Sequence, residues 1–154
     1  LGLKLYHENE SDIFGDRLPE NQILAERLRD GEAFRMIFDF DNYRRGGDDV
    51  WQNWQTLQDH TDAFHLKDSD QNDQHVPIGQ GGGKATEILT DAAKRGWQGP
   101  LTLEPHLRHS AAVLATVASG QDNVSLKDKT RDECFQLAAD VAHDLIEKCG
   151  GKLA

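Results

Sequence analysis

Four apolar segments of this 154-residue chain each end in a side chain that can bind a metal ion or carry a proton. LYHE ends at Glu8, FRMIFD at Asp39, TDAFH at His65 and GPLTLE at Glu104. Three carboxylates and one imidazole suit a divalent cation, Mn²⁺ first, with Mg²⁺, Co²⁺ or Zn²⁺ as alternatives. One acidic residue at a strand end is usually a loop charge or a helix cap, but ligand types at all four ends favour a shared site.

The elements that must position these residues follow from the hydrophobic pattern. We place strands at residues 2–8, 34–38, 61–66 and 99–104. Amphipathic spacing predicts helices at residues 19–31, 50–58, 84–96 and 109–120, and a long final helix that begins at the capping box Thr130–Glu133 and stops at Gly150. Strands that alternate with helices predict a parallel sheet, and ligands bind at the carboxyl edge of such sheets. We expect one domain over residues 1–154, with the four side chains at that edge.

The motifs around these residues, in their order and spacing, resemble the xylose isomerase-like TIM barrels, which include sugar-phosphate isomerases and epimerases. The matching pieces are LYHEN (5–9), FDFDNY (38–43), HLKD (65–68), VPIGQGGG (76–83) and LTLEPH (101–106). The resemblance covers only the carboxyl-terminal half of such a barrel. It implies an α/β fold of parallel (β/α) units, four of the eight, completed by a missing amino-terminal half or by a partner chain. The chain opens with Leu1 in place of methionine, which suits a fragment.

The resemblance also implies roles for individual residues. Glu8, Asp39, His65 and Glu104 would be the metal ligands, and Glu8 and Glu104 would double as the acid–base pair. Moving a proton between neighbouring carbons of a keto sugar needs a base, a nearby conjugate acid and an electrophile that holds the enediolate oxygens. The prediction is a divalent-metal-dependent isomerase or epimerase of a sugar or sugar phosphate.

Polar residues close to the predicted ligands are candidates for substrate contact. They are Asn42, Lys67 and His106, each two or three positions after a ligand. Lys67 shares the inward side of its strand with His65, because side chains two apart in a strand point the same way. Asp68 is expected to orient a ligand.

The stretch from residue 69 to residue 83 is expected to be a solvated loop followed by a glycine-rich turn. It is no nucleotide P-loop, because Ala85 follows Lys84 where serine or threonine is needed, although a sugar phosphate could sit at the helix start. Asp73 and His75 resemble a second metal-ligand pair of endonuclease IV, a relative within the superfamily. An endonuclease IV-like nuclease is therefore one alternative, but Asn42 stands where those enzymes carry histidine.

Two further alternatives use the same residues. One is a metal-dependent dehydratase of a cyclic polyol or keto acid, and the other is a non-catalytic polyol-binding domain. The net charge of −10 argues against a nucleic-acid partner, and no apolar run reaches the roughly 20 residues that span a bilayer. Two cysteines, Cys134 and Cys149, too far apart along one helix for a disulfide favour a reducing compartment, the cytoplasm. Open sheet edges predict a homodimer if no amino-terminal half covers them.

Overall fold

The computed structural model describes residues 2–109 and 123–153. Its elements are β1 (Leu5–Glu8), α1 (Leu18–Leu28), β2 (Phe34–Asp39), α2 (Phe40–Gly46), α3 (Val50–Leu57), β3 (Ala63–Leu66), β4 (Asp68–Ser69), β5 (His75–Val76), α4 (Ala85–Lys94), β6 (Leu101–Leu103), η1 (Val124–Leu126) and α6 (Arg131–Lys148). The short helix expected at 109–120 lies, apart from its first residue, outside the described residues.

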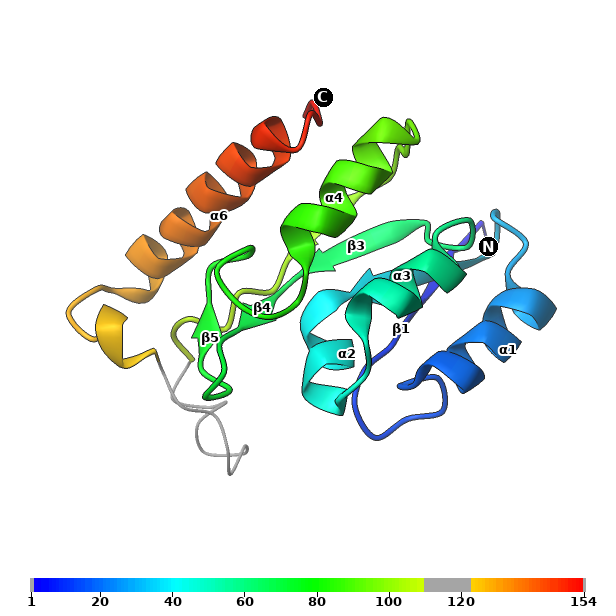
Figure 1. Ribbon diagram of the computed structural model, residues 1–154, viewed down its shortest axis with the longest axis horizontal. Helices are drawn as coiled ribbons and strands as arrows, with labels where there is room; N and C mark the ends of the chain where they lie inside the picture. Colours follow the sequence, from blue (N-terminus) through cyan, green and yellow to red (C-terminus); the bar gives the residue numbers. More distant parts are fainter. Residues whose placement is uncertain (1, 110–122, 154) are drawn as a thin grey trace.

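The four predicted strands form one parallel sheet in the order β1-β2-β3-β6. Helices α1, α3 and α4 lie in front of this sheet in Figure 1, and α6 runs side by side with α4. The α/β half-barrel prediction is confirmed. In the sheet register Asp39 pairs with His65, so the carboxyl ends of β2 and β3 lie level with each other.

Alternation along the strands divides the sheet into two faces. Met36, Phe38, Phe64 and Leu66 are buried on the face that the helices cover, where they join a core that includes the fully buried Trp54. The residues between them point to the other face. Asp39 and His65 are among these, which explains how a strongly apolar strand can end in a charged site.

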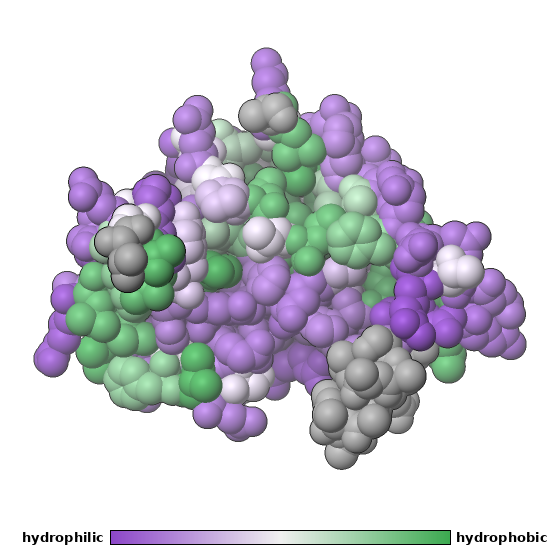
Figure 2. All heavy atoms as spheres, turned by 180° about the vertical axis from the view of Figure 1, so that it is seen from behind, coloured by the Kyte–Doolittle hydropathy of each residue, from purple (hydrophilic) through white to green (hydrophobic). Residues whose placement is uncertain are grey.

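The second face of the sheet is the one that would line the inside of a complete barrel. In Figure 2, which views the molecule from behind, hydrophilic side chains gather across the middle of this surface, with hydrophobic patches around them. Arg35 and Tyr6 lie here as a hydrogen-bonded pair that joins β2 to β1. The candidate site residues lie on this second face, whereas the hydrophobic core lies between the first face and the helices.

Helix α2 and the β4–β5 hairpin differ from the sequence expectation. Helix α2 follows β2 directly and begins where the Asp39 side chain accepts a hydrogen bond from the Asn42 amide. Strands β4 and β5 pair antiparallel as a hairpin, and Ser69 is fully buried, so the prediction of a solvated loop over 69–75 was wrong at its two ends. Two-residue strands have no alternation that a sequence pattern could reveal.

The final helix agrees with the prediction. Thr130 and Glu133 form both hydrogen bonds of the capping box, and α6 ends at the Cys149 cap. Cys134 and Cys149 are buried and not joined by a disulfide, as their positions at opposite ends of one helix required. No helix in the described ranges is long and apolar enough to cross a membrane.

Candidate metal centre

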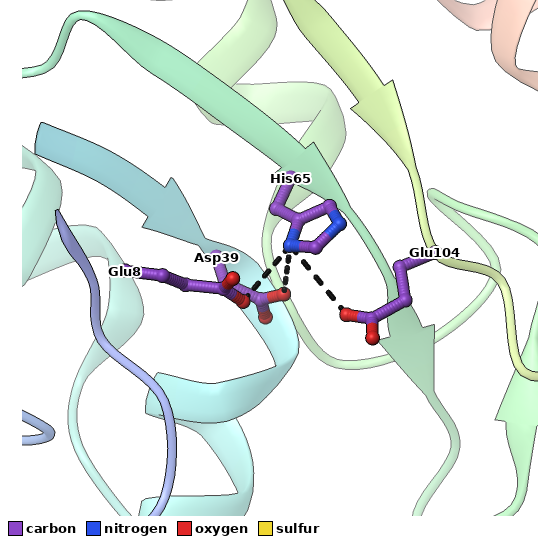
Figure 3. A group of neighbouring side chains, drawn as sticks. All are labelled: Glu8, Asp39, His65 and Glu104. Atoms are coloured by element: carbon purple, nitrogen blue, oxygen red, sulfur yellow. Dashed lines mark hydrogen bonds and ion pairs between the residues drawn. The ribbon is translucent and has the colours of Figure 1, made fainter. Parts of the chain in front are cut away.

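The four predicted ligands lie together at the carboxyl edge of the sheet. One ligand atom from each of Glu8, Asp39, His65 and Glu104 can be chosen so that all four lie within 4.8 Å of one another. In Figure 3 the three carboxylates surround the imidazole and face its Nδ1 atom. That nitrogen lies 2.9 Å from Glu8 Oε1, 3.8 Å from Asp39 Oδ2 and 3.5 Å from Glu104 Oε2. We call these four residues the cage.

The donor set of the cage fits a divalent cation. Oδ2 of Asp39 is buried and has no hydrogen-bond partner within the described structure, although it points at His65. The Lys67 ammonium lies 3.3 Å from this oxygen without a hydrogen bond to it, and a bound metal ion would give the buried negative charge a closer partner. Burial raises the pKa of Asp39 to about 7, against the opposing pull of the Lys67 ammonium. A cation in the cage would keep this carboxylate ionised.

Asp39 is held in position by an asparagine that was not among the predicted site residues. Asn9 is fully buried, donates from Nδ2 to the Asp39 carbonyl at 3.1 Å, and accepts from the Asp39 amide at Oδ1 at 2.9 Å. This two-way bond ties the end of β1 to the end of β2. The one available signal was its place directly after Glu8, in the motif HEN.

The two glutamates of the cage have different partners. Glu8 Oε1 accepts a hydrogen bond from Asn42 Nδ2 at 3.2 Å. The same oxygen is hydrogen bonded to His65 Nδ1 at 2.9 Å, and this second bond raises the pKa of His65. Burial acts to raise the pKa of Glu104, but the hydrogen bond from His106 and the nearby Lys67 ammonium together lower it to about 2. Glu104 is therefore ionised at neutral pH.

The candidate substrate contacts lie at the cage, but each already has a partner there. Asn42 holds Glu8, and His106 Nε2 lies 3.0 Å from Glu104 Oε1. Lys67 is only 5% exposed, and its Nζ lies 3.0 Å from Glu104 Oε2 and 3.3 Å from Asp39 Oδ2. The inward direction of Lys67 was expected from its position two residues after His65, whereas its bridge between two ligands was not.

Asp68 shapes the glycine-rich turn. Its Oδ2 accepts from the amides of Gly79 and Gly81, and its Oδ1 accepts from Gly83, at 2.9 to 3.0 Å. A Cβ at Gly81 would clash with this carboxylate, which explains why glycine is required at that position. The amides that could have received a phosphate are thus engaged by the chain's own carboxylate.

Asp73 and His75 do not belong to the group of close ligand atoms among the described residues. Asp73 lies 2.6 Å from Arg44, and His75 Nε2 lies 3.1 Å from Arg45. Burial lowers the pKa of His75 to about 4, so this imidazole is neutral at neutral pH. A second metal site at this pair stays a prediction.

Comparison with known proteins gives a consistent result. No curated protein sequence matches the chain significantly. A crystal structure of D-psicose 3-epimerase with D-tagatose, from Clostridium cellulolyticum H10, superimposes with a TM-score of 0.66 at 18% identity. The match covers 95% of this chain and 50% of that one, so the chain spans about half the length of its structural neighbour. The model of the family described as xylose isomerase-like TIM barrel matches residues 1–122, and the chain belongs to this family.

Proposed function

We propose that this chain is the metal-binding half of a divalent-metal-dependent enzyme that isomerises or epimerises a sugar or sugar phosphate. The observation that supports this most is the cage itself, in which three side chains at the ends of β1, β2 and β3 and one directly after β6 bring their ligand atoms within 4.8 Å. The family match and the fold of the D-psicose 3-epimerase agree with it. Mn²⁺ is the cation we propose first, with Mg²⁺, Co²⁺ and Zn²⁺ as alternatives for this oxygen-rich set.

The proposed chemistry is proton transfer through an enediolate. A divalent ion held by the cage would polarise the oxygens of a bound ketose and so make the neighbouring C–H more acidic. Glu8 ends the outer strand β1, Glu104 directly follows the outer strand β6, and the two flank His65. Carboxylates on opposite sides of a carbon can remove a proton from one face and return one to the other, as epimerisation requires.

Proton transfer also requires that the two glutamates are held in a fixed orientation. Asn42 donates to Glu8, and His106 is hydrogen bonded to Glu104, so each glutamate has one oxygen oriented by a neighbour. We propose that both neighbours also contact the sugar hydroxyls. Because the chain spans about half of its structural neighbour, loops outside this chain would supply the rest of the substrate contacts.

Two measurements test the proposal. Isothermal titration with Mn²⁺ after chelator treatment should show one site per chain, and His65→Ala should abolish it, while the exposed His143→Ala should not. Incubation of the Mn²⁺-loaded protein with ketohexoses and their phosphates, followed by NMR, should show epimer or aldose product. A protein that binds no divalent ion at this site would refute the proposal, and release of a dehydrated product would favour the dehydratase.

A further inference from the structure

A buried cation already lies against the cage. The side chain of Lys67 is 5% exposed, and its Nζ lies 3.3 Å from Asp39 Oδ2 and 3.0 Å from Glu104 Oε2. The same two oxygens face the imidazole, at 3.8 and 3.5 Å from His65 Nδ1. Lys67 therefore shares two oxygen atoms with any ion that the cage would hold.

Position along the strand explains this arrangement. Lys67 follows His65 by two residues and comes directly after β3, so its side chain lies on the same side as the imidazole. A buried ammonium is stable only when it is paired with negative groups, and Asp39 and Glu104 supply them. The ammonium partly neutralises the negative charge that three carboxylates bring together.

We propose that Lys67 is the internal competitor of the metal ion and sets both the affinity of the cage and its preference for divalent charge. This inference rests on the metal site of the proposed function. Glu8, Asp39 and Glu104 carry three negative charges, and Lys67 carries one positive charge. With a neutral imidazole the net charge is −2, which one divalent ion balances. Without the lysine it is −3, which favours a trivalent ion.

Removing the lysine charge tests the inference directly. Lys67→Met keeps the length of the side chain and removes the charge. We expect it to bind Mn²⁺ about tenfold or more tightly by isothermal titration, the size that repulsion between one positive charge and a divalent ion gives even at a waterlike dielectric constant. Tb³⁺, followed by its luminescence, should gain more affinity than Mn²⁺, because repulsion scales with the charge of the ion. Lys148→Met, on the exposed end of α6, is the matched control and should change neither affinity.

The outcomes are distinguishable. If Lys67→Met does not fold, Lys67→Gln, which can still hydrogen bond to the carboxylates, should give the same increase. If the wild-type chain binds Mn²⁺ and the neutral variants bind it no more tightly, the role of Lys67 is refuted while the metal site stands. If neither the wild type nor the variants bind Mn²⁺ or Tb³⁺, both the inference and the proposed function fail.

Discussion

The two oxygens of Asp39 face different surroundings. Oδ1 accepts from the Asn42 amide at the start of α2, whereas Oδ2 is directed into the cage. The carboxylate is fully buried, and Asn9 fixes the backbone on which it stands. At the scale of the residue, the site thus consists of one anchored carboxylate around which Glu8, His65 and Glu104 are arranged.

The first prediction concerns Glu104. Glu104→Gln keeps the size of the side chain but removes its ability to take up a proton. General acid–base catalysis typically contributes about 10²- to 10⁴-fold, so kcat should fall by that factor at saturating Mn²⁺. Glu32→Gln, at an exposed position outside the cage, is the control and should leave kcat unchanged. Wild-type turnover by Glu104→Gln would remove this residue from the acid–base pair.

The second prediction is a pH dependence of metal binding. A metal ion binds only when Asp39 is ionised and His65 is neutral. Burial raises the pKa of Asp39, and the hydrogen bond with Glu8 raises the pKa of His65. Protons must leave as the ion enters, so Mn²⁺ affinity should fall as the pH drops through about 7. Titrations between pH 5.5 and 8 should show a decrease of about tenfold per pH unit for each proton that the ion displaces, and so up to about a hundredfold per unit once both groups are protonated. A flat profile would contradict the protonation states assigned to the cage.

At the scale of the element, Asp68 links the hairpin to the turn before α4. Each of its oxygens accepts two amides: Oδ2 those of Gly79 and Gly81, and Oδ1 those of Gly83 and Ser69. The turn brings the chain from β5 to the start of α4 without a side chain in the way. One carboxylate therefore organises the whole stretch between His65 and the helix.

The third prediction follows from that carboxylate. Asp68→Asn places an NH₂ donor where an oxygen accepted two amides, which leaves buried donors unpaired. The free energy of unfolding should fall by about 1.5–3 kcal/mol, the range for hydrogen bonds to charged groups. Urea denaturation measures this change, and the exposed Asp128→Asn should be close to neutral. Equal stability of the two variants would show that Asp68 is dispensable for the turn.

The sequence predicted the main elements because their signals are local. Four apolar runs, the amphipathic helices and the Thr130 capping box depend on residues within one or two turns of one another. The cage could be predicted as well, since all four ligands occupy the same place in a repeated unit. Three other contacts could not be predicted: that of Lys67 with Glu104, that of Asn9 with Asp39 and that of Asp68 with the glycine amides. In each of them the partners lie 11 to 37 residues apart, and only the folded chain brings them together.

At the scale of the whole molecule, the described part of the sheet has two open edges, β1 and β6. Leu3 and Leu5 near the first edge are 73% and 64% exposed. Unpaired strand edges with apolar side chains favour pairing with another chain. The fold is half of the barrel that its structural neighbour contains, so these surfaces are those that a second half would cover.

The fourth prediction is that two copies of this chain associate through these edges when no other half is present. Light scattering coupled to size-exclusion chromatography should give twice the mass of one chain at micromolar concentration. Leu5→Lys, which places a charge on the β1 edge, should shift the population towards the monomer, whereas Lys4→Arg should not. A wild-type monomer throughout the concentration range would contradict this prediction.

The most direct test of the central claim is a crystal structure of the protein soaked in Mn²⁺, with the ion located from its anomalous scattering. We expect one strong peak within about 2.0–2.3 Å of oxygen atoms of Glu8, Asp39 and Glu104 and of Nδ1 of His65. An anomalous map with no peak among these four side chains, or with its peak elsewhere on the protein, would contradict it.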